Sequence, residues 1–421
     1  DLVRGVATRA PHRLAVTDGS NEWTFGLLAT QMDALAGWLT ARRVGHGDVV
    51  AVYAHRSGSL VRAVTGVLAS GAAYVLLDPQ YPPARLAQLL RIVEPSAWLA
   101  LDAAGPPPGA VVSVLDELCV EHRVSLPRRA DAAELWACLG VAGDESGVPC
   151  VDIGPDDPAC LTFTSGSTGT PKAVIGRHGS LTHFLPWMSD EFGVGEDDRF
   201  SMLSGLSHDP LQRDMFWPLS LGAAIVVPDP EQMGTAGYLA RWMSDERVSV
   251  AHFTPAMGQL VTEPSAAVSD RRTSVASLRV ALFIGDVLTQ DLVARLQRMA
   301  PNVRVVNLYG TTETQRASGY HVVGVNERPA GGTRPKEVLP LGRGMPGAQL
   351  LVRTSGRTPA AIGEVGEVVM RSPHLALGYW HDDELTAARF EPDPHGASAH
   401  DQLYATGDRG RYRADGAVEF L

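Results

Sequence analysis

Residues 164–172 read Thr164-Ser165-Gly166-Ser167-Thr168-Gly169-Thr170-Pro171-Lys172, with two glycines, five hydroxyl side chains and one lysine. The loop follows a short apolar run that we predict to be a buried strand. Glycines permit tight turns, and the amides, hydroxyls and ammonium can then converge on one concave surface, which suits a polyphosphate. We therefore predict a phosphate-binding loop at the carboxyl end of this strand.

Two alternatives for this loop are disfavoured. A Walker loop needs four residues between its glycines and a hydroxyl residue after the lysine. Here two residues separate Gly166 from Gly169, and Ala173 follows Lys172, which weakens kinase-type and GTPase interpretations. A flexible linker is disfavoured because linkers rarely follow a buried strand and close on Pro-Lys.

On both sides of this loop, short apolar β-rich runs alternate with helix-length amphipathic segments. This alternation predicts an α/β fold in which mainly parallel sheets are covered by helices. The predicted strands are Val49–Tyr53, Ala73–Leu77, Cys160–Thr164, Ala223–Val227, Val248–Phe253, Val280–Ile284 and Val303–Leu308. The predicted helices are Arg56–Ala69, Ala84–Val93, Leu181–Glu191, Asp209–Leu219, Tyr238–Asp245 and Gln290–Met299.

The texture of the sequence changes near residue 320. Asn326–Lys336 is rich in Gly, Pro and Arg, and the runs Gln349–Arg353, Gly366–Arg371 and Gly416–Leu421 alternate without long helices between them. We predict two interleaved α/β subdomains in residues 1–320 and a small β-rich subdomain in residues 321–421. The stretch Asp102–Asp157 is rich in Ala, Gly, Pro and acidic residues, and we predict that it crosses the surface between the two α/β units.

The composition limits the possible classes of protein. The chain has 421 residues, 45% of them hydrophobic, which predicts a globular protein of two or three domains. Its net charge of −11 disfavours a general nucleic-acid binder. The spacing of the four cysteines matches no metal site or CxxC motif, so we expect reduced thiols. The apolar window Leu60–Leu77 is interrupted by Arg62 and two glycines, so we expect no membrane anchor, and a start at Asp1 without a leader predicts a cytoplasmic protein.

Seven short motifs follow one another along the chain. They are Trp23-Thr24-Phe25, the run from Leu68 to Pro79, the phosphate loop, His208-Asp209, the run from Asn307 to Glu313, Gly366-Glu367 with Gly378-Tyr379, and the run from Tyr404 to Asp408. In this order they resemble the adenylate-forming (ANL) superfamily, and the second motif and Asp209 resemble the amino-acid adenylation domains of nonribosomal peptide synthetases. The resemblance implies two packed α/β subdomains plus a small distorted β-barrel subdomain. Ala173 stands where the family usually has Gly.

The resemblance implies ATP and Mg²⁺ as cofactors. Thr164, Lys172, Thr312 and Glu313 would act in catalysis, with Glu313 also ligating the metal. The nucleotide would be bound by Ser165, Gly166, Ser167, Thr168, Gly169, Gly285, Asp286, Asn307, Tyr309, Gly310, Thr311 and Asp408, with Tyr309 stacking on adenine and Asp408 binding the ribose hydroxyls. These roles fit the side chains, because carboxylates suit a hard cation or paired hydroxyls and an aromatic face suits a purine. Taken singly, a Glu in a Thr-rich loop is more often a helix cap, and Thr-Gly-Asp more often a turn.

Carrying over the family's amino-acid pocket gives His208, Asp209, Pro210, Arg213, His252, Leu282, Ile284, Leu308, Arg316 and Ala317. Asp209 would pair with the α-ammonium of the substrate, although as a lone residue it reads as a helix N-cap before Pro210. Arg213 and Arg316 cannot be buried without an anion, and a side-chain carboxylate of the substrate would supply one. In the alternative interpretation, Arg213 pairs with Asp214 or Asp209, and Arg316 points to solvent.

A narrower resemblance covers three stretches, Leu206–Phe216, His252–Leu260 and Tyr309–Arg316, which look like the adenylation domain of α-aminoadipate reductase. The leading substrate is therefore L-2-aminoadipate, although Leu282, Ile284 and Leu308 depart from the more usual Phe, Val and Met. The alternatives are activation of lysine or another polar amino acid, a carboxylate–CoA ligase, and an inactive scaffold that only docks partners.

The resemblance also implies partners. The product would be loaded onto the phosphopantetheine thiol of a peptidyl carrier protein domain, and an MbtH-like protein is a further possible partner. The sequence ends at Glu419-Phe420-Leu421, where the family continues into a hinge and a small domain with a further lysine. We therefore expect this chain to bind ATP and amino acid but to adenylate poorly.

Overall fold

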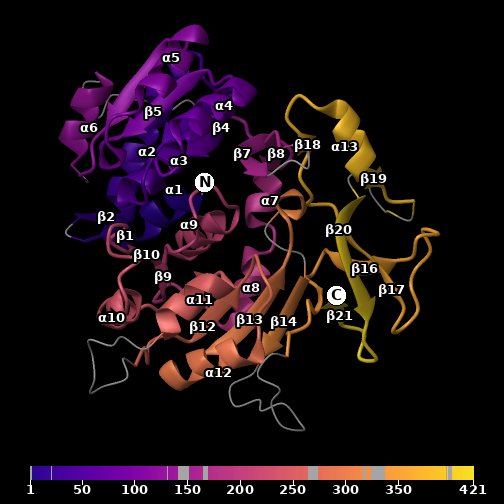
Figure 1. The fold of residues 1–421 in the computed structure, drawn as a ribbon. Coiled ribbons are helices and arrows are strands. Elements are labelled where there is room, and N and C mark those ends of the chain that lie inside the picture. Colours follow the sequence, from indigo (N-terminus) through magenta and orange to yellow (C-terminus); the bar gives the residue numbers. More distant parts are fainter. Residues whose placement is uncertain are drawn as a thin grey trace.

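The computed structural model describes residues 2–19, 21–129, 131–140, 151–164, 169–263, 274–315, 319–323, 337–394, 396 and 401–421. Their strands form sheets of nine, seven and five strands (Figure 1). The two larger sheets are mainly parallel, because their strands are apolar runs buried on both faces. The third sheet is antiparallel. The predicted α/β fold is confirmed.

The nine-stranded sheet is parallel from β1 through β10, β9, β11 and β12 to β13. Antiparallel strands extend it at both edges. In spatial order its strands are β15 (Arg343–Gly344), β14 (Gly319–Val323), β13 (Arg304–Tyr309), β12 (Val280–Phe283), β11 (Val250–Phe253), β9 (Arg199–Ser201), β10 (Ala224–Val227), β1 (Leu14–Asp18) and β2 (Asn21–Thr24).

The seven-stranded sheet takes its last strand from far along the chain. In spatial order it holds β18 (Gly378–Tyr379), β8 (Lys172–Arg177), β7 (Pro158–Thr164), β4 (Ala73–Leu77), β3 (Val49–Tyr53), β5 (Ala97–Leu101) and β6 (His122–Leu126). β18 follows residue 320 and pairs antiparallel with β8. The five-stranded sheet contains β16 (Gln349–Arg353), β17 (Val365–Ser372), β20 (Gln402–Tyr412) and β19 (Phe390–Pro392), with β21 (Val418–Phe420) paired to β20.

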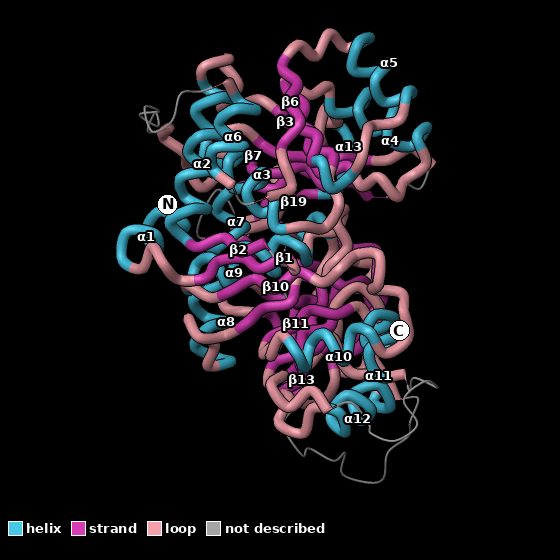
Figure 2. Tube along the Cα trace, turned by 90° about the vertical axis from the view of Figure 1, so that its left-hand side faces the viewer, coloured by secondary structure: helices cyan, strands magenta, loops and turns pink. Residues whose placement is uncertain are grey.

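Helices cover the two larger sheets. They are α1 (Leu2–Arg9), α2 (Phe25–Thr40), α3 (Gly58–Ala69), α4 (Pro83–Val93), α5 (Gly109–Glu117), α6 (Ala132–Leu139), α7 (His178–Thr182), α8 (Leu185–Phe192), α9 (Pro210–Leu221), α10 (Tyr238–Asp245), α11 (Pro255–Thr262), α12 (Gln290–Met299) and α13 (Asp383–Arg389). Figure 2 shows α10, α11 and α12 grouped beside the nine-stranded sheet. Among the described residues, no helix has both the length and the apolar character needed to cross a bilayer.

The two faces of the nine-stranded sheet pack against different helices. Successive residues of a strand point to opposite faces. Val250, Leu282 and Val306 pack in the core that includes α9, whereas Ala251 and Phe283 pack with α10, α11 and α12. A residue's position in β11, β12 or β13 therefore decides which of the two cores it joins.

The predicted surface connection Asp102–Asp157 is wrong for its first part. A 3₁₀ turn at Asp102–Ala104 leads to α5, β6 and α6, and β6 is an edge strand paired in parallel with β5. The composition was misleading because three prolines precede α5 and because β6, at the edge, exposes alternate side chains. Residues 141–150 lie outside the described part of the chain.

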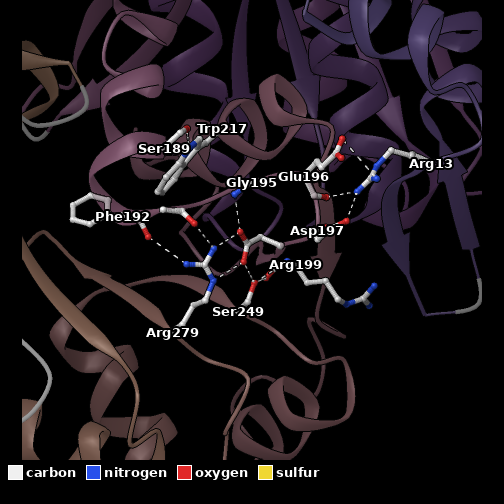
Figure 3. A network of polar contacts seen from close by, with 12 residues as sticks. Arg13, Ser189, Phe192, Gly195, Glu196, Asp197, Arg199, Trp217, Ser249 and Arg279 are labelled. Atoms are coloured by element: carbon white, nitrogen blue, oxygen red, sulfur yellow. Dashed lines mark hydrogen bonds and ion pairs between the residues drawn. The ribbon is translucent and has the colours of Figure 1, made fainter.

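A polar network, which we call the Asp198 network, joins Asp198, Ser249 and Arg279 at the amino ends of β9, β11 and β12 (Figure 3). Asp198 Oδ1 accepts hydrogen bonds from Ser249 Oγ at 2.7 Å and from Arg279 Nε at 2.9 Å. Its Oδ2 accepts from Gly195 N at 2.8 Å and from Arg279 Nη2. Arg279 also donates to the carbonyl oxygens of Phe192 and Gly193 at the end of α8. The network therefore fixes α8 against three strand starts.

Candidate active site

The first half of the candidate site is built around Tyr379 on β18. Lys172 begins β8 opposite Thr164, the last residue of β7. The Lys172 Nζ atom lies 5.8 Å from the centroid of the Tyr379 ring, within cation–π range. The Tyr379 hydroxyl donates a hydrogen bond of 2.9 Å to Glu313 Oε1. The structure thus brings two predicted catalytic residues, Lys172 and Glu313, to one tyrosine, and a third, Thr164, lies opposite Lys172.

Glu313 is a buried carboxylate, 8% exposed, with phenols as neighbours. Burial, followed by the charge of Glu313, raises the pKa of Tyr379, and the same two causes raise the pKa of Tyr404. Both phenols therefore stay protonated and can donate to the carboxylate. The helix-cap alternative for Glu313 is wrong, because Thr311 N donates to Thr314 Oγ1 and these two threonines cap the 3₁₀ turn Thr312–Thr314.

A second tyrosine connects the nine-stranded sheet to the five-stranded sheet. The Tyr309 hydroxyl, at the end of β13, donates to Asp408 Oδ2 on β20 at 2.6 Å. Burial, followed by the hydrogen bond to Asp408, raises the pKa of Tyr309. The turn alternative for Asp408 is wrong, because this residue lies inside β20.

The other predicted nucleotide residues are distributed around these contacts. Asn307 is buried and its Nδ2 donates to Pro340 O at 2.8 Å. Gly310, Thr311 and Thr312 are half-buried between β13 and Glu313. Gly169, Gly285 and Asp286 are exposed, and both glycines adopt the left-handed backbone that favours glycine. The predicted phosphate contacts Ser165, Gly166, Ser167 and Thr168 lie outside the described residues.

The second half of the site lies on the α9 face of the nine-stranded sheet. His252 pairs in register with Leu282, and both are buried. Ile284 and Leu308, near the carboxyl ends of β12 and β13, belong to the same core as Leu282. Strand alternation therefore gathers four predicted pocket residues on one face, and β13 continues from Leu308 to Tyr309.

Arg213 faces this group from α9 and is 1% exposed. Its neighbour Asp214 is 0% exposed, and Asp214 Oδ1 lies 2.7 Å from His252 Nδ1. Asp214 Oδ2 accepts a hydrogen bond from Ser204 N at 2.9 Å. The Asp214 carboxylate therefore contacts both the His252 ring and the Ser204 amide. The Trp217 ring lies edge-on to His252, 6.1 Å between centroids.

The pKa of His252 is lowered by burial, which outweighs the hydrogen bond and charge of Asp214, while Arg213 adds to the lowering. The imidazole is therefore neutral near neutral pH. Because a carboxylate only accepts hydrogen bonds, the nitrogen that faces Asp214 carries the proton. The other nitrogen, Nε2, is buried and has neither a hydrogen bond nor an ion pair among the described residues.

The remaining pocket residues lie at and beyond the start of α9. Asp209 occupies the N-cap position with a helical backbone, and its side chain makes no capping hydrogen bond. Pro210 is the first helical residue. His208 is exposed and lines a separate hollow of about 20 Å³ with Tyr74 and Gln212, room for about one water molecule. Arg316 and Ala317 lie outside the described residues.

Three residues at the centre of these contacts were not among the predicted site residues. Tyr379 and Tyr404 belong to two of the seven motifs, so motif membership was the signal for them. Asp214 follows Arg213 directly, but only the fold places it against His252.

The profile of the AMP-binding enzymes matches residues 3–380. The chain belongs to this family of AMP-binding enzymes. Among the curated relatives of this AMP-binding enzyme, the L-2-aminoadipate reductase large subunit of Eremothecium gossypii is 39% identical over 100% of this chain and 33% of its own length. The L-2-aminoadipate reductase of Schizosaccharomyces pombe is 40% identical over 94% of this chain and 30% of its own length. The chain thus spans about a third of these relatives.

Solved structures share the fold of this AMP-binding enzyme. A crystal structure of the nonribosomal peptide synthetase FmoA3 superposes with a TM-score of 0.84 at 30% identity, covering 100% of this chain and 42% of that one. A second structure of FmoA3, with AMPPNP bound, has a TM-score of 0.84 at 29% identity. Both structures are therefore of one nonribosomal peptide synthetase, with AMPPNP bound in the second.

Proposed function

We propose that this chain activates an amino acid with ATP, forming an aminoacyl-adenylate and releasing pyrophosphate. The single observation that carries the proposal is the meeting of Lys172 and Glu313 at the Tyr379 ring, beside the phosphate loop. An ammonium and a buried carboxylate that both contact one tyrosine suit a phosphate chain and its accompanying metal. The curated aminoadipate reductases and the AMPPNP-bound neighbour support the same activity.

The residues fit a nucleotide with Mg²⁺. Lys172, Thr164 and the phosphate loop would hold the β- and γ-phosphates, Thr312 the α-phosphate, Glu313 the metal, Tyr309 the adenine and Asp408 the ribose. The donor set suits a hard cation, because Glu313 offers carboxylate oxygens and the nearby groups are hydroxyls. When bound, Mg²⁺ supplies positive charge that offsets the charge of the phosphates.

The reaction needs no general base. The substrate carboxylate is already ionised, so its oxygen attacks the α-phosphorus while the bond to the β-phosphate oxygen breaks. The protein contributes positioning and electrostatic stabilisation. In this proposal Lys172 offsets the negative charge of the departing pyrophosphate. The Tyr309–Asp408 hydrogen bond fixes the position of the Tyr309 ring, on which the adenine would stack.

The substrate end favours L-2-aminoadipate or another amino acid with an acidic side chain. Asp209, at the N-cap position before Pro210, would hold the α-ammonium of the substrate, as the resemblance to adenylation domains implies. Arg213, buried on the same helix, would hold the distal carboxylate. The adenylate would then pass to the phosphopantetheine thiol of a carrier domain.

The test is binding of aminoacyl-sulfamoyladenosines, stable mimics of the adenylate, measured by calorimetry with this chain. We expect the 2-aminoadipyl mimic to bind more tightly than the lysyl and leucyl mimics, and Lys172→Ala and Glu313→Gln to weaken all three. Tighter binding of the leucyl mimic would overturn the acidic-substrate proposal. Binding of simple acyl mimics that survives Asp209→Ala would favour the carboxylate–CoA ligase, and no binding at all would favour the inactive scaffold.

A further inference from the structure

The buried contact between Asp214 and His252 has a chemical consequence for an acidic substrate. We propose that His252 takes up one proton when the distal carboxylate of the substrate binds, and that Asp214 is the positioning residue that makes this uptake necessary. The inference rests on the proposed function, because it concerns a substrate with a negative side chain.

The contact with Asp214 orients the imidazole of His252. His252 Nδ1 lies 2.7 Å from Asp214 Oδ1, and both side chains are almost completely buried, at 1% and 0% exposure. The carboxylate holds the proton of the neutral ring on Nδ1. Nε2 then carries a lone pair. Nδ1 has the Asp214 carboxylate at 2.7 Å, whereas Nε2 has neither a hydrogen bond nor an ion pair among the described residues.

Several elements contribute side chains around the His252 ring. α9 contributes Arg213 and Asp214, whose charges act on His252 in opposite directions. The segment before α3 contributes Arg56, a buried guanidinium that donates to Met202 O and interacts with the charge of Asp214. β12 contributes only the apolar residues Val280–Phe283, and the edge of Trp217 closes another side. Asp214 and Arg213 are therefore the charges that act on His252, and Arg56 acts on Asp214.

The distal carboxylate of the proposed substrate would change the protonation of this ring. A carboxylate oxygen beside the Nε2 lone pair would be repelled, since both groups only accept hydrogen bonds. A proton from solvent bound at Nε2 turns the ring into a donor at both nitrogens, and the imidazolium then lies between two carboxylates. A neutral side chain that carries its own hydrogen-bond donor can use the lone pair directly and needs no proton.

The experiment is calorimetry of this chain with two ligands, the 2-aminoadipyl sulfamoyladenosine and its side-chain amide. Titrations at pH 7.5 in buffers of different ionisation enthalpy give the number of protons taken up. We expect uptake approaching one proton for the acid and none for the amide. The affinity ratio of acid to amide should then fall with rising pH, by up to about tenfold per pH unit.

Three variants sharpen the measurement. His252→Gln should abolish the uptake. Asp214→Asn should reduce it, because the amide can donate to Nδ1 and leave Nε2–H as a neutral donor. The control is His178→Gln, which removes a buried histidine outside the site, whose pKa burial lowers to about 4, and should leave the uptake unchanged.

The outcomes are distinct. Equal uptake for acid and amide, or a pH-independent affinity ratio in the unmodified chain, would overturn the role of His252, whatever the variants do. Tighter binding of neutral aliphatic ligands, or no binding of either ligand, would overturn the proposed function and the inference with it. Uptake that persists in Asp214→Asn would overturn the positioning role alone.

Discussion

Two buried aspartates serve the two ends of the nine-stranded sheet in different ways. Asp198, at the amino ends of the strands, accepts hydrogen bonds from a backbone amide, a serine and both arms of Arg279. Asp214, at the carboxyl end, accepts from Ser204 N and contacts His252. The contacts of Asp198 fix the strand starts in place. Asp214 instead contacts an imidazole, that of His252, whose Nε2 atom has no hydrogen-bond partner among the described residues. We therefore predict that the ligand binds at the carboxyl end, beside the imidazole that Asp214 contacts.

The largest effect should come from breaking the anchor. Asp198→Ala leaves Arg279 and Ser249 without their partner at the start of three strands, and we expect the free energy of unfolding to fall by about 3–5 kcal/mol. Chemical denaturation measures this. The ligand preference of the protein that remains folded should not change, and a changed preference would contradict the division of roles.

We expect a fall in pH to destabilise the folded chain through two histidines. Burial lowers the pKa of His252 and lowers that of His178 to about 4. The unfolded chain binds these protons below pH 6.5 and the folded chain does not, so stability is lost as the pH falls from 6.5 toward 4. For His178 the loss is up to about 3 kcal/mol.

Unfolding curves across this pH range test the acid effect. His178→Gln and His252→Gln should each remove part of the slope. A free energy of unfolding that is flat between pH 6.5 and pH 4 would contradict burial as the cause of either shift.

Arg213→Gln should affect the ligand rather than the fold. The loss of a charge-assisted hydrogen bond costs about 1.5–3 kcal/mol, so the preference for the 2-aminoadipyl mimic over its amide should fall by about 10- to 100-fold. The matched control is Arg279→Gln, which should lower stability and keep the preference. If both variants behave alike, Arg213 is a structural residue.

We expect the smallest loss of stability from removing a hydrogen bond between α9 and α8. Trp217 Nε1 donates to Ser189 Oγ at 2.9 Å, drawn in Figure 3, and Trp217 also packs edge-on against His252. Ser189→Ala should cost about 1 kcal/mol of stability, the value of one hydrogen bond, and thermal unfolding measures it. A large loss of ligand binding instead would show that the position of α9 limits the site.

Much of the fold could be predicted from local patterns. Val49–Tyr53 and Ala73–Leu77 are strands with the predicted bounds, because five consecutive buried apolar residues leave little alternative. Tyr238–Asp245 and Gln290–Met299 are helices with the predicted bounds, since one face of each is apolar. β6 was not predicted because its side chains at the sheet edge are partly exposed and it lacks an apolar run. β8 was not predicted because it follows the phosphate loop without a break.

The candidate site divides along the same line. Lys172, Glu313, Arg213 and His252 could be singled out by motif, and the fold places them in two neighbouring groups. The contact between Asp214 and His252 could not be predicted, because it joins a helix to a strand that comes 38 positions later in the chain. That pairing depends on how α9 lies across the sheet, which no local pattern encodes.

The pairing of β18 with β8 sets an order on biosynthesis. Asp214 and His252 leave the ribosome early, and their contact can form as soon as α9 and β11 exist. The hydrogen bond between Tyr309 and Asp408 joins residues 99 positions apart, and the aromatic partner of Lys172 arrives only with residue 379. The end that we propose for the amino acid can therefore form on a nascent chain before the proposed nucleotide end is complete. A ribosome-stalled intermediate that ends before β18 should then lack the Tyr379 contacts of the proposed ATP site.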